Sequence, residues 1–119
     1  LHTMIRRRQT DSAGQTVETA KEYIRQHYAE SDLSVEKLCA YLHLSSTYFS
    51  TLFKRETGTS FTAYVTTVRM EAAAEAIRST EEKTYLIAQR CGYEDPNYFS
   101  YVFKRHFGVT PTKYRSEGK

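Results

Sequence analysis

Two segments of the sequence carry polar and basic side chains at the spacing of one helix face. The first set is Thr47, Ser50, Thr51 and Lys54, followed by Arg55, and the second is Asn97, Ser100, Tyr101 and Lys104, followed by Arg105. Hydroxyl and amide groups hydrogen-bond to base edges, whereas Lys and Arg bind phosphates. We therefore expect the three polar residues of each set to contact bases of double-stranded DNA, and each Lys-Arg pair to contact its phosphates. A polar stripe is also typical of a solvated helix face, but its duplication favours binding.

The two sets lie in an internal repeat. The segment YFSTLFKR at 48–55 returns fifty residues later as YFSYVFKR at 98–105. Ser45 or Ser46 can cap a helix in the first copy, and Asp95 before Pro96 is a strong helix start in the second. Gly58 and Gly108 stand at equivalent positions, where glycine ends a helix. The repeat therefore predicts two helices of similar length.

A shorter helix precedes each of these, and the pair has the proportions of a helix-turn-helix. Ser34 is a candidate N-cap for the first short helix. The turn then needs a residue with positive φ, which suits Gly92 and is tolerated by His43. In a helix-turn-helix the second helix lies in the major groove of DNA. Small residues are expected where the two helices of each pair cross, and Cys39 and Ala88 occupy these positions. The buried face of each second helix is expected to be apolar, with Phe49, Leu52 and Phe53 in the first copy and Phe99, Val102 and Phe103 in the second.

The elements divide the chain into four parts. Residues 1–15 are predicted to be a flexible tether from a missing upstream domain, 16–59 the first helix-turn-helix subdomain with an amphipathic helix over 16–29, 60–79 a linker helix, and 80–117 the second subdomain. Scarce Pro and Gly favour helices, so the fold class is all-α. The linker is predicted to bury a single stripe: Phe61, Tyr64, Val65, Val68, Ala72 and Ala76. The second helix of each pair is the predicted recognition helix. The linker's span of roughly 28 Å would place the two recognition helices close to one DNA turn apart, which is roughly 34 Å.

The net charge of +3 is small, but its distribution is uneven. Residues 15–44 hold three basic and five acidic residues, and residues 70–95 hold three and six. By contrast, residues 45–69 hold three basic residues and one acidic residue, and residues 96–119 hold five basic residues and one acidic residue. The cations therefore concentrate with the two predicted recognition helices, as a phosphate-binding surface requires.

Other classes of protein find less support. The two cysteines, Cys39 and Cys91, form no C-x-x-C pair and no zinc cluster, so a cysteine-dependent repair enzyme is disfavoured, and no catalytic, metal or cofactor site is predicted. No apolar run is long enough to span a bilayer, and the first residues do not predict a signal peptide, so we expect a cytoplasmic protein without a membrane partner. A helical protein-interaction module remains an alternative, because helix pairs also bind proteins.

The sequence resembles the AraC/XylS family of bacterial transcription regulators over about residues 16–116. The most specific stretch runs from Ile87-Ala88 through GY at 92–93, DPNYFS at 95–100, FKR at 103–105 and FG at 107–108 to TP at 110–111 and Tyr114-Arg115. Departures from the family pattern are small: His43 occupies the first turn, and Tyr101 stands where an arginine or lysine is common.

This resemblance implies seven helices in two helix-turn-helix subdomains, an asymmetric DNA site and activation of transcription through RNA polymerase. It also implies that Arg69 ties the linker helix to its subdomain. The amino-acid sequences of both copies are similar to those of AraC-type output domains of two-component response regulators, and this similarity implies an upstream receiver domain. The alternative is an upstream domain that binds a sugar or another metabolite.

Overall fold

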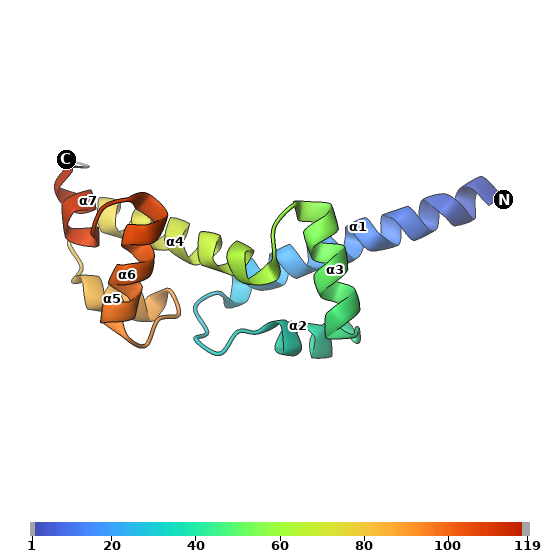
Figure 1. Cartoon of the computed structure of the whole chain (residues 1–119), viewed down its shortest axis with the longest axis horizontal. Helices are drawn as coiled ribbons and strands as arrows, with labels where there is room; N and C mark the ends of the chain where they lie inside the picture. Colours follow the sequence, from blue (N-terminus) through green and yellow to red (C-terminus); the bar gives the residue numbers. More distant parts are fainter. Residues whose placement is uncertain (1, 118–119) are drawn as a thin grey trace. The chain divides into compact units, whose positions relative to one another are not determined.

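The computed structural model describes the backbone of residues 2–117 and the side chains of residues 13–117. Within this range the regular elements are seven helices and no strands, which confirms the predicted all-α class. The helices are α1 (His2–His27), α2 (Val35–Leu42), α3 (Ser46–Thr57), α4 (Phe61–Ser79), α5 (Thr84–Arg90), α6 (Pro96–Phe107) and α7 (Pro111–Glu117) (Figure 1). No helix in the described part of the chain combines the length and apolarity needed to cross a bilayer.

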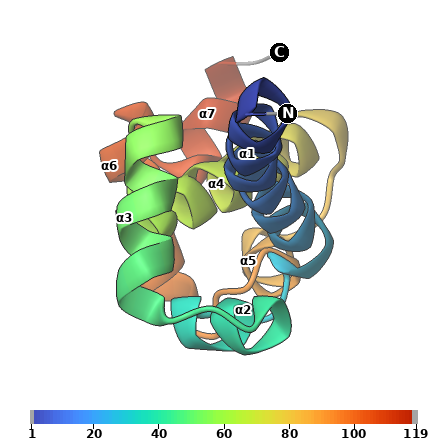
Figure 2. The same cartoon turned by 90° about the vertical axis from the view of Figure 1, so that its right-hand side faces the viewer.

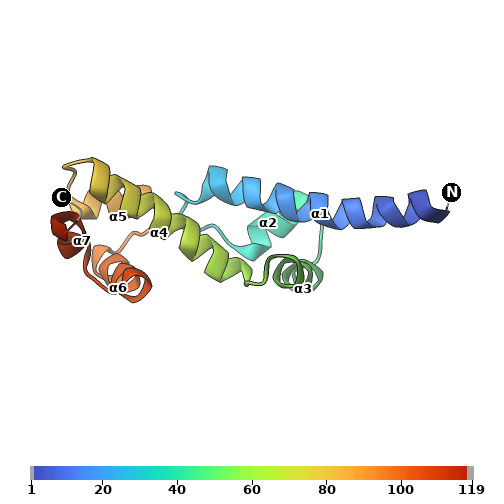
Figure 3. The same cartoon turned by 90° about the horizontal axis from the view of Figure 1, so that it is seen from above.

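The chain forms two compact units. The first contains α1, residues 33–60 with α2 and α3, and the start of α4 up to Val65, and the second contains residues 28–32, the rest of α4 and helices α5 to α7. Figure 2 shows α2 at the foot of α3 in the first unit, and Figure 3 shows α5, α6 and α7 gathered around the C-terminal half of α4 in the second. The loop at 28–32 therefore belongs to the second unit although it directly follows α1.

Each unit packs its second helix through the same aromatic arrangement. In the first unit the Phe53 ring meets the edge of Tyr64 at 5.4 Å and 87°. In the second, Phe103 and Tyr114 lie at 5.4 Å and 83°. The predicted buried faces are confirmed, with Val102 half-buried and the other five side chains buried: Phe49, Leu52, Phe53, Phe99 and Phe103. Because the repeated residues make the same contacts, the duplication in sequence is a duplication of cores.

The turns have the predicted backbone conformations. His43 has φ 60° and ψ 44°, and Gly92 has φ 91°. Cys39 and Ala88 are buried at the equivalent positions where small residues are expected. The two turns differ in crowding, because a Cβ on Gly92 would lie 2.6 Å from the Tyr28 carbonyl oxygen and 2.9 Å from Arg69 Nε. Gly92 is therefore required both for its positive φ and for the close approach of the loop at 28–32.

Helix α1 begins earlier than predicted. Residues 2–15, expected to be a flexible tether, are helical and continue directly into the predicted helix, which ends at His27 rather than at 29. Ser12-Ala13-Gly14 does not interrupt it, because a single glycine costs a helix only about 1 kcal/mol and no proline is present. A connection to an upstream domain stays a prediction, and residue 1 lies outside the described residues.

Helix α4 does not bury the single stripe that was predicted. Its first turns contribute Phe61 and Val65 to the first core, whereas the second core takes a different set: Met70, Ala73, Ala74 and Ile77. Tyr64, Val68, Ala72 and Ala76 are half-buried, and Ala72 and Ala76 pack against the second core. The predicted stripe is therefore only partly buried, because the helix serves two cores in turn and the second core takes further positions that the stripe did not include.

Candidate nucleic-acid interface

The polar stripe of α3 is fully presented to solvent. Thr47, Ser50, Thr51 and Lys54 are all exposed, and the opposite face of the helix is buried. The helix begins where the Ser45 hydroxyl oxygen accepts the backbone N–H of Tyr48 at 3.1 Å. It ends at Gly58, whose N–H donates to the Lys54 carbonyl at 2.8 Å. The caps therefore set the length over which the stripe is displayed.

The stripe of α6 is similar but not identical. Asn97, Tyr101 and Lys104 are exposed, whereas Ser100 is half-buried. An Asp95 carboxylate oxygen accepts the Asn97 N–H at 2.9 Å, and the Gly108 N–H donates to the Lys104 carbonyl at 2.7 Å. The second stripe thus displays two predicted base-reading residues openly and one partly.

The basic residues at the two helix ends have different neighbours. Arg55 Nε lies 3.5 Å from a carboxylate oxygen of Glu56, its neighbour in sequence. Arg105 instead donates from Nη1 to the Tyr101 hydroxyl at 3.1 Å, and its guanidinium lies 5.9 Å from the centre of the Tyr101 ring. This hydrogen bond raises the pKa of Arg105, so that side chain is cationic at every physiological pH. Lys54 and Lys104 are exposed.

Several cations away from the recognition helices are paired with acids. These pairs are exposed and contribute little to stability, but each one offsets a positive charge. The cationic character of the surface is therefore weaker there than around Lys104 and Arg105 at the end of α6. The pairs are Lys21 with Glu18 at 3.4 Å, Arg25 with Glu22 at 3.0 Å, Arg78 with Glu75, and Arg90 with Glu82.

Two exposed tyrosines of α3 and α6, Tyr48 and Tyr98, were not predicted to lie at the interface. Tyr48 and Tyr98 occupy equivalent positions and are 55% and 56% exposed. Tyr98 stacks on Tyr101 with ring centres 6.3 Å apart and an interplanar angle of 26°. Together with Arg105 and His106 these two rings line a hollow of about 430 Å³ beside α6. The repeated Tyr before each buried Phe was the available signal, since that position lies off the buried face.

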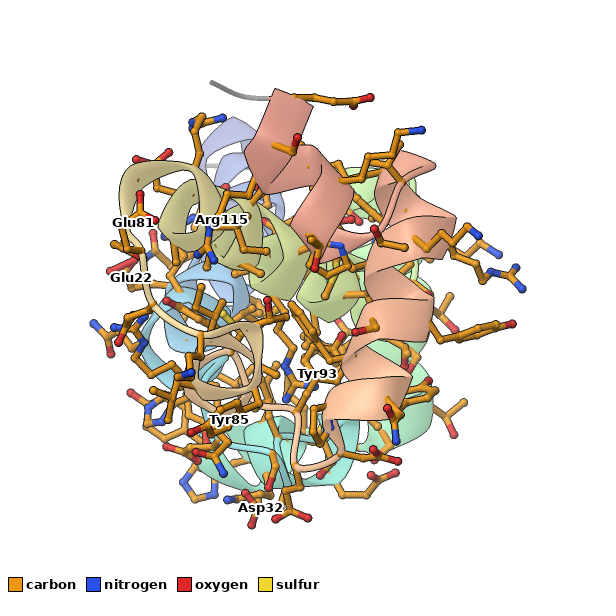
Figure 4. The ribbon with its side chains drawn as sticks, turned by 90° about the vertical axis from the view of Figure 1, so that its left-hand side faces the viewer. Glu22, Asp32, Glu81, Tyr85, Tyr93 and Arg115 are labelled. Atoms are coloured by element: carbon orange, nitrogen blue, oxygen red, sulfur yellow. The ribbon has the colours of Figure 1, made fainter. Side chains whose placement is uncertain are left out.

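Two arginines hold the elements that carry α6. Arg69 donates from Nε to the Tyr28 carbonyl at 2.9 Å and from Nη2 to the Glu30 carbonyl at 2.8 Å, and its guanidinium lies 5.4 Å from the centre of the Tyr93 ring. Arg115 donates to the carbonyls of Ile77 and Glu82, at 2.9 and 2.8 Å. Figure 4 labels Tyr93 and Arg115 in this unit. The expectation that Arg69 ties the linker helix to its subdomain is confirmed, and Arg115 does the same for α7.

Both cysteines are buried. Cys39 and Cys91 are each 3% exposed, and burial raises the pKa of each thiol. Among the described residues no group of three His, Cys, Asp or Glu side chains is placed to hold a metal ion.

Comparison with known proteins gives consistent matches. A family model described as a helix-turn-helix domain matches residues 38–117. The raffinose operon transcriptional regulatory protein RafR from Pediococcus pentosaceus is 35% identical over 96 residues, which cover 81% of this chain and 34% of RafR. RhaR from Mannheimia succiniciproducens, which is named a transcriptional activator, is 46% identical over 65 residues, which cover 55% of this chain and 24% of RhaR. The chain spans about a third of the length of the first curated relatives it matches.

Solved structures match over most of the chain. The C-terminal domain of AraT, a response regulator from Geobacillus stearothermophilus, is 42% identical with a TM-score of 0.85, covering 86% of this chain and 84% of that one. The DNA-binding domain of AdpA, a global transcriptional factor, was solved in complex with a target DNA. It is 25% identical with a TM-score of 0.80, covering 85% of this chain and 90% of that one.

Proposed function

We infer the mode of action from family membership: this chain belongs to the AraC-type helix-turn-helix family of DNA-binding transcription regulators. We propose that α3 and α6 act as its two recognition helices and enter successive major-groove segments of one asymmetric site. The proposed base-reading residues are Thr47, Ser50 and Thr51 on α3, and Asn97, Ser100 and Tyr101 on α6. The proposed phosphate contacts are Lys54, Arg55, Lys104 and Arg105.

One observation carries this proposal. Both second helices bury an aromatic face and expose a stripe of small or hydrogen-bonding side chains that ends in Lys-Arg. Short polar side chains let a helix approach base edges closely, and cations at its end meet the phosphates that border the groove. A helix face that is merely solvated has no need for hydrogen-bonding residues followed by Lys-Arg. Because this order occurs in both helices, it favours binding.

The proposed outcome of binding is activation of transcription through contact with RNA polymerase. The support for activation is that RhaR, a relative matched in several bacteria, is named a transcriptional activator. We propose further that this domain is the output part of a response regulator, which the 42% identity to AraT supports. RafR, named for a sugar operon, supports the alternative that a sugar or metabolite controls the protein.

The DNA-binding proposal is tested by selecting bound sequences from a random duplex pool and footprinting the selected site. We expect a preferred sequence with two protected major-groove segments separated by about 10 base pairs. Affinity should fall steeply as salt rises, because phosphate contacts release counterions. Binding that is insensitive to salt, or protection of a single segment, would contradict the proposed mode and favour a protein-interaction module.

The upstream control is tested on the full-length protein. If it is a response regulator, treatment with a small phosphoryl donor should raise its affinity for the selected site, and candidate sugars should have no effect. The reverse result would identify the metabolite-responsive alternative.

A further inference from the structure

Helix α6 carries a group of side chains that α3 lacks. Tyr98, Tyr101 and Arg105 follow one another at i, i+3 and i+7, so they lie along one side of the helix. The two rings are stacked at 6.3 Å, and the hydroxyl of Tyr101 accepts a hydrogen bond from Arg105 at 3.1 Å. Tyr101 therefore contacts both of its neighbours, and Arg105 is held by a hydrogen bond as well as by the face of the ring.

The equivalent side chains of α3 have no such arrangement. Thr51 replaces Tyr101, and its short side chain offers no ring. Arg55 replaces Arg105, and its neighbour Glu56 lies 3.5 Å away, where α6 has His106 instead. Glu56 offsets the charge of Arg55 and repels phosphate, whereas Arg105 keeps its full charge. Two arginines at equivalent positions of the repeat thus have different electrostatic surroundings, a carboxylate beside Arg55 and a tyrosine hydroxyl beside Arg105.

We propose that Tyr101 is a positioning residue that orients Arg105 to bind a phosphate of the DNA backbone, and that α6 is consequently the stronger of the two backbone anchors. This inference rests on the proposed DNA binding by α3 and α6. An arginine that is oriented before binding loses less rotamer freedom when it meets phosphate, and its planar guanidinium offers two parallel donors. In this inference Tyr101 acts through Arg105, and this positioning role takes the place of the base-reading role proposed for Tyr101 above.

The first test compares the two arginines, for which the repeat supplies a matched control. Affinity for the selected duplex is measured at several salt concentrations for the wild type, Arg105→Ala and Arg55→Ala. We expect Arg105→Ala to weaken binding about tenfold or more and to reduce the slope of log affinity against log salt by about one. Arg55→Ala should weaken binding less than about threefold, and Glu56→Gln should strengthen it. Equal losses from the two arginines would overturn the inference.

The second test separates positioning from direct reading. Tyr101→Phe keeps the ring and removes only the hydroxyl that accepts from Arg105. We expect it to weaken binding several-fold and to lower the salt slope in the wild-type background, but to have no effect in the Arg105→Ala background. The same loss in both backgrounds would show that the hydroxyl contacts DNA itself and would contradict the positioning role.

Controls keep the outcomes distinct. Thermal melting of every variant should match the wild type, since all the altered side chains are exposed. If the wild type binds duplex DNA without salt dependence, the proposed function fails. If it binds as proposed but the two arginines are equivalent, only the present inference fails.

Discussion

At the scale of single residues, the second unit depends on one crowded contact. Arg69 reaches two carbonyls of the loop at 28–32, and Gly92 leaves the space through which that loop approaches. Both carbonyls accept a hydrogen bond from the same guanidinium. Since Gly92 also forms the turn before α6, the position of this recognition helix depends on a loop more than 60 residues earlier in the chain.

Replacing Gly92 by alanine should therefore destabilise the protein strongly. The new Cβ would lie 2.6 Å from a backbone oxygen, and the alanine would also have to adopt the positive φ of Gly92. We therefore expect the free energy of unfolding to fall by at least about 2 kcal/mol. Urea denaturation followed by circular dichroism measures it. Gly58→Ala is the matched control, because Gly58 has a positive φ of 81° but open space around it, and only about 1 kcal/mol should be lost. Equal losses at the two glycines would contradict the steric argument.

The exposed lysines at the ends of the two stripes should act through charge. Lys54→Ala and Lys104→Ala are each expected to weaken binding to all duplex sequences similarly and to reduce the salt slope by about one. Fluorescence anisotropy with specific and random duplexes measures both effects. Lys21→Ala removes a lysine that is paired with Glu18 on α1, so its salt slope should equal that of the wild type. A wild-type slope in Lys54→Ala or Lys104→Ala would exclude a phosphate role for that residue.

At the scale of elements, each recognition helix is oriented by its buried aromatic face. Phe53 and Phe103 are fully buried and make the same edge contact with a tyrosine of the helix that follows. The edge contact involves Tyr64 of α4 in the first unit and Tyr114 of α7 in the second. The start of α4 therefore supports α3 in the same way that α7 supports α6.

Truncating either phenylalanine should open a cavity under one recognition helix. Phe53→Ala and Phe103→Ala are each expected to cost about 3–5 kcal/mol of stability. Hydrogen exchange should show loss of protection mainly in the first unit for Phe53→Ala and mainly in the second for Phe103→Ala. Phe→Leu at the same sites, which leaves a smaller cavity, is the control and should cost less. A wild-type melting temperature for either alanine variant would contradict the assignment of that phenylalanine to the buried face of its helix.

At the scale of the whole molecule, a near-neutral chain presents two cationic helix ends. The two acidic stretches, 15–44 and 70–95, alternate with the two basic ones, and several cations outside the recognition helices are paired with acids. A low net charge limits indiscriminate adhesion to DNA, whereas local positive charge retains phosphate binding. The duplication thus supplies two similar helix surfaces on one chain, both proposed to bind DNA, and the contacts of Arg55 and Arg105 make these surfaces unequal.

Changes in the two polar stripes should affect separate parts of the DNA site. Variants at Ser50 or Thr51 are expected to change base preference in one segment, and variants at Asn97 to change it in the other, because each helix would read its own stretch of groove. Selection from a random duplex pool, repeated for each variant, measures this. Lys104→Ala serves as the control and should lower affinity without changing the selected sequence. Unaltered selection profiles would show that these side chains do not read bases.

The sequence by itself determined much of the local structure. The repeat, the capping residues, the glycine stops and the buried face of each second helix follow from patterns within about ten residues, and periodicity reports such patterns directly. The positive φ of His43 and Gly92 followed from the same local reasoning. The exposed side of α3 was predictable for the same reason, because exposing one face is the consequence of burying the other.

Only the tertiary structure decided which distant groups meet. Arg69 and the Tyr28 carbonyl are 41 residues apart, and no pattern in either segment indicates their partnership. The loop at 28–32 joins the second unit, and α4 changes its buried positions along its length, because each core selects side chains by packing rather than by periodicity. The contacts of Arg105 with Tyr101 and of Arg55 with Glu56 are local, but they depend on side-chain geometry, so two segments that are similar in sequence expose different surfaces.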